Sequence, residues 1–315
     1  MRVLLSTCVE HPRLSASDAL LEKALEQRGH TVSAVPWNGP EPDDEIYANV
    51  DAVVLRANWD YHANPQAFLA WLDRLDKRGI RVLNDTKLVR WNLDKRYLVE
   101  LQEKLGGRGS DQEANGQGGG AAAGGRLRIP EVHVVDHHDP GGIVALMARL
   151  GWEEAVLKSI SGQSGYHCER IRRDNIEAWE AAALEIPTEA ALLQAFQPEI
   201  CTLHETVFVF FSGEFSHATR RIVAEGEWRA NSRFGAVKEA VVAPSALLVQ
   251  QARCVLQAAP ASVPPLYARV DGIVDGDTLI LMELELIEPT LYLDTDAQAA
   301  DRLADALEKA VLMET

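Results

Sequence analysis

The amino-acid sequence predicts an α/β protein, with an N-terminal open parallel α/β lobe followed by lobes of the α+β type. Residues 1–88 alternate short apolar runs with amphipathic runs, which is the pattern of β-α-β units. Residues 266–293 form a β-branched ribbon interrupted at Asp275-Gly276-Asp277, a turn signal typical of an antiparallel hairpin. The chain has 315 residues, enough for two or three lobes with a substantial core.

The N-terminal lobe is predicted to be an open, mostly parallel sheet with helices on its faces. Its expected elements are strands at 3–5, 31–35, 52–55 and 81–83 and helices at 18–28 and 65–77. The first helix carries Leu21 and Leu25 on one face and ends at Gly29. No G-x-G-x-x-G motif follows the first strand, so a dinucleotide site is not expected.

A polar cluster, Arg56, Asn58, Asp60 and Tyr61, follows directly on the strand at 52–55. Ligands of open α/β sheets bind beyond the carboxyl ends of strands, so this cluster is a candidate for substrate binding. Arg56 could hold a carboxylate in a bidentate pair and Asp60 an ammonium group. The alternative is a loop anchored by a buried Trp and a surface ion pair, and both interpretations stay open.

Residues 84–105 are predicted as one helical run, which includes Lys95. Residues 106–126 are rich in glycine, alanine and small polar residues and have almost nothing to bury, which predicts a disordered Gly-rich insertion. The remaining expected elements are strands at 132–135, 155–160, 168–171, 206–211 and 214–221 and helices at 142–150, 177–184, 247–258 and 296–313.

Lys158 ends a predicted strand and is followed by a loop of small residues that includes Ser161 and Gly162. A lysine beside such a loop can hold phosphates while the N–H groups of the loop close over them. The same composition is also common in ordinary turns. The pattern therefore allows a phosphate site here without requiring one.

The central ribbon carries three acidic residues, Asp271, Glu283 and Glu285, among apolar neighbours. A carboxylate on a buried sheet face loses hydration unless a cation or donors replace the water. Glu283 and Glu285 share one face, with Met282 and Leu284 on the other. Taking the loop as Asp275 to Asp277 places Asp271 opposite Leu281, about 7–8 Å diagonally from Glu283; a bulge is the other arrangement that brings Asp271 to the same face.

Such a trio of hard oxygen ligands suits one or two Mg²⁺ or Mn²⁺ ions better than zinc, because no His or Cys stands at ligand spacing beside it. Arg269 falls on the same face and suggests an anionic substrate such as a phosphate. The alternative is a hairpin with one polar, solvated face. The apolar residues at odd and even positions of 279–287 favour a strand buried on both faces, and therefore the metal site.

Composition excludes several classes of function. A net charge of −16 argues against a nucleic-acid or membrane surface, since these need clustered Lys and Arg. The four cysteines have no paired spacing, which predicts reduced thiols. The N-terminal apolar run is too short for a signal peptide and no run is long enough to span a membrane, so we expect a cytoplasmic protein.

The run R-V-D at 269–271, followed by L-M-E-L-E-L-I-E-P at 281–289, resembles the metal-binding end of ATP-grasp ligases. In that family an Asp, a Glu and an Asn two residues later hold two Mg²⁺ ions against ATP. Glu285 stands in place of the Asn, as in a subgroup similar to glutathione synthetases and the cycloserine-forming cyclo-ligase. The resemblance implies an N-terminal domain at 1–88 and an ATP-grasp fold of two α+β subdomains at 89–315.

The resemblance also assigns roles by position. Asp271, Glu283 and Glu285 would bind the metal ions, Lys95 and Lys158 would be the two ATP-contacting lysines, and Ser161 and Gly162 would belong to the mobile phosphate loop. The implied adenine contacts are Gln194, Ala195 and Phe196, and Glu205 would hold the ribose. Arg229 and Arg269, favoured over Arg221, would neutralise the transferred phosphate.

The implied function is an ADP-forming, ATP-dependent carboxylate–amine ligase acting on small amino acid-like substrates through an acyl phosphate, in amino acid or peptide biosynthesis. Two alternatives stay open: an intramolecular cyclo-ligase of the cycloserine-forming type and a non-catalytic ATP-binding regulator. The implied partners are small carboxylates and amines, with a homodimer left open. Asp271→Asn or Glu283→Gln is expected to abolish turnover and to leave the fold intact.

Overall fold

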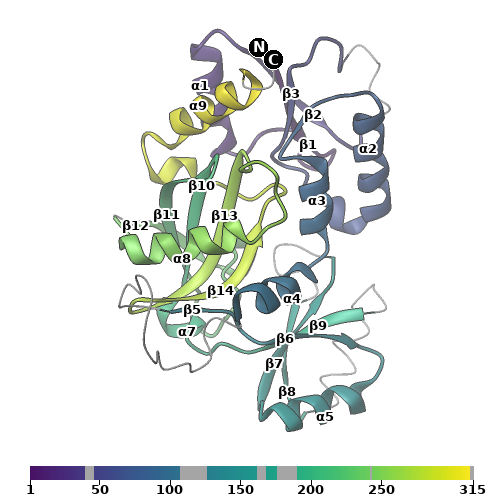
Figure 1. Ribbon diagram of the computed structural model, residues 1–315, viewed down its shortest axis with the longest axis vertical. Coiled ribbons are helices and arrows are strands. Elements are labelled where there is room, and N and C mark those ends of the chain that lie inside the picture. Colours follow the sequence, from purple (N-terminus) through teal and green to yellow (C-terminus); the bar gives the residue numbers. More distant parts are fainter. Residues whose placement is uncertain (40–45, 107–125, 162–167, 176–189, 242, 313–315) are drawn as a thin grey trace, which may run out of the picture.

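The computed structural model describes residues 1–39, 46–106, 126–161, 168–175, 190–241 and 243–312. Within these ranges the strands form three sheets, of four, six and four strands. In Figure 1 the N-terminal sheet lies at the top, the six-stranded sheet in the middle and the second four-stranded sheet at the bottom. No helix in these ranges has the length and apolarity needed to cross a membrane.

The N-terminal sheet is parallel, with the strand order β2-β1-β3-β4. Its strands are β1 (Arg2–Thr7), β2 (Thr31–Pro36), β3 (Ala52–Leu55) and β4 (Val82–Leu83), and its helices are α1 (Asp18–Gln27) and α2 (Pro65–Lys77). Helix α2 begins at the N-cap Asn64, whose side chain accepts from the Ala67 N–H, and buries Phe68 and Trp71. The predicted α/β lobe is confirmed.

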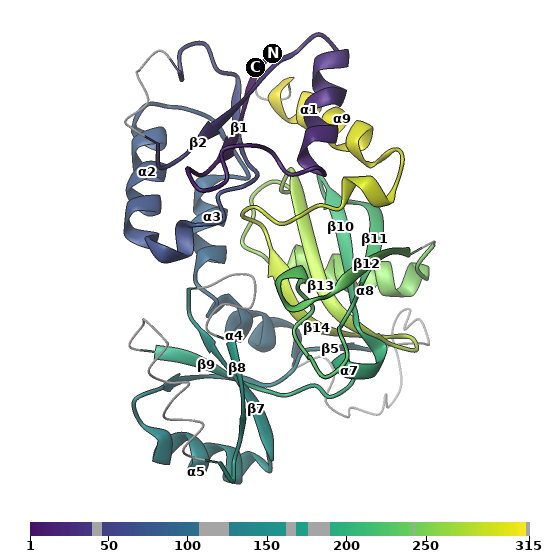
Figure 2. The same cartoon turned by 180° about the vertical axis from the view of Figure 1, so that it is seen from behind.

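The C-terminal helix α9 (Ala299–Leu312) returns to this lobe and packs beside α1, as Figures 1 and 2 both show. Leu303 and Leu307 of α9 are buried in one apolar cluster with Leu21 and Leu25 of α1. Helices from both ends of the chain therefore share one apolar core, which fixes the N-terminal sheet in place relative to the neighbouring elements.

The six-stranded sheet has the order β12-β11-β10-β13-β14-β5. Its strands are β10 (Glu205–Phe211), β11 (Glu214–Ile222), β13 (Tyr267–Asp275), β14 (Thr278–Glu285), β12 (Val237–Val241) and β5 (Leu127–Arg128). The last two were not predicted, because one is exposed along its length and the other has two residues. Helix α8 (Ala246–Gln257) contacts β13 and β14 through Leu248, Ala252 and Val255.

The second four-stranded sheet is antiparallel, with the order β6-β9-β7-β8. Its strands are β6 (Val132–Asp136), β7 (Glu154–Ser159), β8 (Cys168–Arg172) and β9 (Ala190–Ala195), and helix α5 (Pro140–Leu150) packs on it through Ile143 and Met147. Short elements complete the fold: α7 (Ile200–Leu203), η1 (Tyr61–Ala63), η2 (Gln102–Gly106), η3 (Ser232–Phe234) and η4 (Leu293–Thr295). The predicted insertion, apart from its ends, and the helix expected at 177–184 lie outside the described residues.

The helical run predicted at 84–105 is broken. The structure has α3 (Thr86–Leu93) and α4 (Tyr97–Leu101), separated at Asp94, whose backbone is extended with ψ 110°. The Asp94 carboxylate accepts from the Arg96 N–H, and the Lys95 N–H donates to the Ile160 carbonyl at 2.8 Å. Asp favours such local hydrogen bonds over the helical ones. Lys95 therefore stands in a turn between two helices and is tied to the end of β7.

The β13–β14 hairpin has a two-residue turn and a bulge, which corrects the predicted three-residue loop. Asp275 pairs with Thr278 across Gly276-Asp277, and the register shifts between Asp271 and Gly272. Asp271 is therefore directly opposite Glu283, and Met282 is the extra residue of the bulge. Glycine is required at 272, because a Cβ there would lie 2.6 Å from the backbone oxygen of Ile280.

We expect Gly272→Ala to lower the free energy of unfolding by about 1–3 kcal/mol, since the added methyl group has no space and the bulge must deform. Urea denaturation followed by circular dichroism measures this. Gly141→Ala in α5 is the matched control: its Cβ would meet no atom closer than 3.7 Å, so its stability should stay within about 1 kcal/mol of wild type. Equal stabilities would show that the bulge does not depend on this close contact.

Candidate active site

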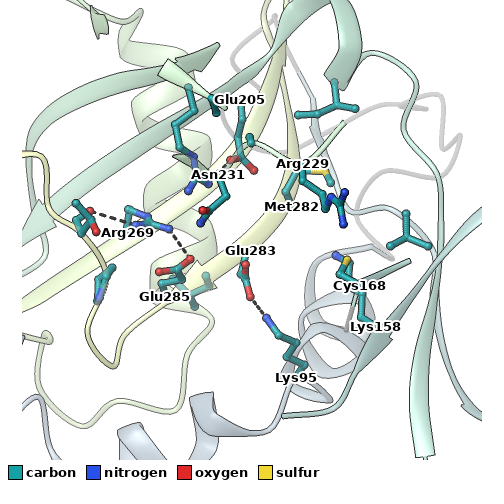
Figure 3. Close-up of a pocket in the computed structure, with 18 of the residues that line it drawn as sticks. Lys95, Lys158, Cys168, Glu205, Arg229, Asn231, Arg269, Met282, Glu283 and Glu285 are labelled. Carbon is teal, nitrogen blue, oxygen red and sulfur yellow. Dashed lines mark hydrogen bonds and ion pairs between the residues drawn. The ribbon is translucent and has the colours of Figure 1, made fainter. Parts of the chain in front are cut away.

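A cavity of about 710 Å³ opens between the six-stranded sheet and the β6-β9-β7-β8 sheet. Its walls come from the bulged end of β14, from β7 and β9, from the turn between α3 and α4, and from the segments 228–238 and 287–292. Figure 3 shows charged side chains of β14, β7, the turn between α3 and α4 and the segment 228–238 around it, namely Glu283, Glu285, Lys158, Lys95 and Arg229. Residues far apart in the sequence thus meet at one site.

The acidic face of the hairpin forms one wall of the cavity. Asp271 is opposite Glu283 and Arg269 is opposite Glu285, so the four side chains form two neighbouring cross-strand pairs. The side chains of Glu283 and Glu285 are 31% and 29% exposed, whereas that of Asp271 is fully buried. The trio lies on one face, but Asp271 stands behind the other two.

Two arginines surround Asp271. Arg269 donates to both its oxygens at 2.8 Å, and Arg221 donates to Oδ2 at 2.6 Å. Burial alone would raise the pKa of Asp271, but the two guanidinium groups hold it below its usual range. Arg269 also pairs with Glu285, and Arg221 with Glu205. These ion pairs form one continuous network, most of whose members line the cavity.

Two lysines lie on the other side of the cavity. Lys95 pairs with Glu283, and Lys158 on β7 donates to the Gln194 amide oxygen on β9 at 2.6 Å. Burial, and next the charge of Lys158, lowers the pKa of Lys95 to about 8. Burial also lowers the pKa of Lys158. Both groups are desolvated, so a bound anion would stabilise their charged forms.

The cavity is lined by apolar as well as polar residues. Phe196 and Trp228 meet edge to face at 6.1 Å between ring centroids, and both pack, like Met282, against the apolar cluster of Ile200, Val223, Ile273 and Ile280. Cys168 lies next to Lys158 in Figure 3. Further polar residues of the lining are Tyr61, Asn231, Lys238, Glu288 and Tyr292. Burial, and next the charge of Glu285, raises the pKa of Glu288 to about 8.

Comparisons with known proteins identify the fold. Residues 3–84 match the family model for the N-terminal domain of the D-cycloserine synthetase DcsG. The chain is 28% identical over 302 residues to the cycloserine biosynthesis protein DcsG of Streptomyces lavendulae, covering 91% of each chain. It is also similar to the crystal structure of D-cycloserine synthetase DcsG, with a TM-score of 0.80 and 25% identity over 99% of this chain and 100% of that one.

Two further solved structures share the architecture at lower identity. The RimK domain ATP-grasp protein of Sphaerobacter thermophilus has a TM-score of 0.66 and 18% identity, with 97% and 98% of the two chains covered. The chain has the ATP-grasp fold. The D-alanine–D-alanine ligase of Bacillus anthracis, in complex with ATP, has a TM-score of 0.66 and 15% identity over 100% and 98% of the chains.

In this ATP-grasp protein, most of the predicted site residues come together. The cavity is lined by Lys95, Lys158, Gln194, Ala195, Phe196, Glu205, Arg229, Arg269, Glu283, Glu285 and Tyr61. Asp271 lies directly beneath it. Ser161 does not line the cavity; its carbonyl accepts from the Ser159 hydroxyl at 2.8 Å. Gly162 lies outside the described residues.

Three predicted substrate contacts are corrected, because their side chains have structural partners away from the cavity. Arg56 is fully buried and donates to Asp18 at 2.8 Å and to the Pro289 carbonyl at 2.6 Å. Asn58 donates to the Ser6 hydroxyl, and Asp60 accepts from the Trp37 indole. The sequence predicted the end of the strand correctly, but it could not show that these three side chains bond to other parts of the protein and do not face the cavity.

Arg229, which the sequence favoured, and Arg221, which it did not, both line the cavity but have different partners. Arg229 lines the cavity but is held by Glu227 at 2.8 Å and lies over the Phe234 ring at 3.6 Å. Arg221, which the prediction placed second, bridges Glu205 and Asp271 inside the ion network. Register explains this position, because Glu205 is paired with Arg221 across β10 and β11. A regular hairpin at Ser212-Gly213 would pair Glu205 with Arg220, so the pairing depends on the register shift between Val209 and Phe210.

The carboxylates form no closed metal site as they stand. Within the part of the chain that the structure describes, no three Asp, Glu, His or Cys side chains are gathered as a ligand set. The reason is that cations already pair with these carboxylates. Lys95 pairs with Glu283 and Arg269 with Glu285, and Arg221 and Arg269 together bind both oxygens of Asp271. The donors nevertheless fit a hard divalent cation in chemistry, since Glu283 and Glu285 face the cavity side by side.

Proposed function

We propose that this ATP-grasp ligase forms a C–N bond between a carboxylate and an amine of small amino acid-like substrates, with ATP converted to ADP and phosphate through an acyl phosphate. The observation that carries the proposal is the meeting of Lys95, Lys158, Glu283 and Glu285 around one cavity. These groups come from three separate places, the turn between α3 and α4, strand β7 and strand β14, and two lysines beside paired carboxylates suit the binding of a nucleotide phosphate chain with its metal ions.

The balance of charge supports a role for divalent cations. The cations of Lys95, Arg221 and Arg269 are paired with Glu205, Asp271, Glu283 and Glu285, and Arg229 and Lys238 are paired with Glu227 and Asp294, so little positive charge at the site is left without a carboxylate partner. A triphosphate would be repelled there without further cations. We propose that Glu283 and Glu285, with Asp271 behind them, hold Mg²⁺, two ions in number. Bound Mg²⁺ would neutralise the phosphate oxygens.

The residues that line the cavity would have separate roles. The Phe196, Trp228 and Met282 surface and the neighbouring Gln194 and Ala195 offer an apolar slot for adenine. Lys95 and Lys158 would contact the phosphates, and Arg229 and Arg269 would stabilise charge on the transferred group. A substrate carboxylate oxygen attacks the γ-phosphorus and ADP leaves. The amine then attacks the acyl carbon, loses a proton, and expels inorganic phosphate.

A screen for ADP release tests this function. The full chain is incubated with Mg²⁺, ATP and single or paired amino acids in both enantiomers, and ADP is measured by a coupled assay. We expect release that depends on a specific amino acid-like substrate. Binding of ATP without ADP release under any amino acid or amino acid pair would instead favour the non-catalytic regulator.

A second candidate is intramolecular ring closure, in which one molecule supplies both carboxylate and amine. The similarity to D-cycloserine synthetase DcsG over nearly the whole chain favours it. Mass spectrometry of the product decides: cyclisation gives one substrate minus water, whereas ligation gives the sum of two substrates minus water.

Replacing Lys158 by Met should weaken binding of a non-hydrolysable ATP analogue by about 10- to 100-fold, the value of a hydrogen bond to a charged group. Isothermal titration calorimetry with Mg²⁺ present measures it. Lys104→Met is the control, because the Lys104 side chain is 46% exposed and pairs with Glu100 away from the cavity. An unchanged dissociation constant for Lys158→Met would remove Lys158 from the nucleotide site.

A further inference from the structure

One carboxylate in the cavity wall has no task in the chemistry described so far. Glu288 is 5% exposed and lines the cavity. Its own backbone N–H donates a hydrogen bond to the carboxyl group, but Oε1 has no hydrogen-bond partner among the described residues. A buried oxygen without a partner destabilises the folded state, so its presence calls for an explanation other than packing.

The backbone around Glu288 is held from behind. The Ile287 carbonyl accepts from the Tyr267 hydroxyl at 2.7 Å, and the Pro289 carbonyl accepts from buried Arg56 at 2.6 Å. The Thr290 carbonyl accepts from Arg269 at 3.1 Å. These bonds fix the segment against the N-terminal sheet and β13, which leaves the Glu288 side chain as the group that the segment presents to the cavity. Arg56, expected to bind substrate itself, is here a support for this segment.

The charged groups near Glu288 do not satisfy it. Those that influence it are Glu285, Arg56, Arg269, Tyr61 and Tyr267. Arg56 donates to Asp18 and to carbonyls, Arg269 donates to Asp271, Glu285 and a carbonyl, and the Tyr267 hydroxyl donates to carbonyls. Glu285 adds like charge. The free oxygen therefore suits a ligand that brings N–H donors and positive charge.

We propose that Glu288 binds the amino group of the amino acid-like substrate and thereby selects substrates that carry one. The inference rests on the proposed function and deepens it. An ammonium group beside Glu288 restores the hydrogen bond that the protein leaves unmade, and it lies on the same cavity as the phosphate-binding lysines. A carboxylate-bearing molecule without an amino group would leave the buried oxygen unpaired and should be rejected.

The test compares wild type with Glu288→Gln and Glu288→Asp, using the full chain with Mg²⁺ and a non-hydrolysable ATP analogue. The probes are alanine and serine in both enantiomers, each paired with its counterpart lacking the amino group, propionate and 3-hydroxypropionate. Binding is measured by calorimetry, and ADP release is measured with ATP. Glu239→Gln on β12 is the control, since the Glu239 side chain is 55% exposed and lies outside the cavity.

We expect Glu288→Gln to weaken binding of whichever amino acid releases ADP by about 10- to 100-fold. Its affinity for the ATP analogue should stay within about twofold, and Glu288→Asp should recover part of the loss. Wild type should prefer the amino acid to its counterpart, and Glu288→Gln should lose most of that preference. The melting temperature of Glu288→Gln should equal or exceed that of wild type, because a buried carboxyl group with one unpaired oxygen is replaced by a neutral amide.

Three outcomes overturn the inference. Unchanged amino acid affinity in Glu288→Gln removes Glu288 from substrate binding, and an equal loss for the amino acid and its counterpart removes the amino group as its target. A fall in melting temperature together with both affinities assigns Glu288 a structural role. Failure of the proposed function looks different: wild type would release no ADP with any amino acid, and the inference would fall with it.

Discussion

Glu283→Gln should lower amino acid-dependent ADP release by about 10²-fold or more, with little change in melting temperature. The magnitude is that of removing one group that stabilises charge in the transition state. Glutamine keeps the shape of the side chain but supplies no charge to a divalent cation. The fold should tolerate the change, because the Glu283 side chain is 31% exposed and its partner Lys95 has a pKa of about 8, so Lys95 can give up its proton.

Steady-state kinetics over a range of Mg²⁺ concentrations measure this effect, and thermal unfolding monitors the fold. Glu239→Gln serves as the control for losing one surface carboxylate from the same sheet. Turnover at the wild-type rate in Glu283→Gln would contradict the assignment of β14 to the metal site. A large fall in melting temperature would show that the ion pair between Glu283 and Lys95 mainly stabilises the fold.

Asp271→Asn should destabilise the protein by about 3–5 kcal/mol, the value for breaking a buried ion pair from one side. Its carboxylate is fully buried between Arg221 and Arg269, and the substitution leaves two buried guanidinium groups with less compensating charge. The sequence alone predicted that this variant keeps its fold intact, whereas the buried ion pairs predict a loss of stability. Loss of activity in Asp271→Asn alone would therefore not identify a metal ligand.

Urea denaturation measures the predicted change in the free energy of unfolding. Asp277→Asn in the hairpin turn is the matched control, because the Asp277 side chain is exposed and its substitution should change stability by less than about 0.5 kcal/mol. Stability of Asp271→Asn within that same range would show that the ion network adds nothing to the fold.

The elements of the fold could be predicted because their signals are local. Helix α2 and strand β3 have the bounds that the spacing of apolar residues predicted, 65–77 and 52–55. The hairpin register could not be predicted, because the bulge at Met282 depends on the close approach of Gly272 to the facing strand. The break at Asp94 follows from hydrogen bonds that a helical periodicity does not contain.

The candidate site shows the same division between local and long-range information. The acidic residues of the hairpin could be predicted as site residues, because carboxylates interrupt the apolar pattern of a buried strand. Arg56 could not be placed, since its direction depends on Asp18, which lies 38 positions away in the sequence. Glu288 was passed over for the opposite reason: a single Glu before a proline has no periodic signal, and only the fold reveals that it is buried in a cavity wall.

The most direct measurement is anomalous diffraction from crystals grown with Mn²⁺ and a non-hydrolysable ATP analogue. The proposed function predicts anomalous peaks beside the carboxylates of Glu283 and Glu285, with the phosphates of the analogue in contact with Lys95 and Lys158. Manganese bound elsewhere, or a nucleotide lying away from both lysines while Glu283 stays paired to Lys95, would contradict it.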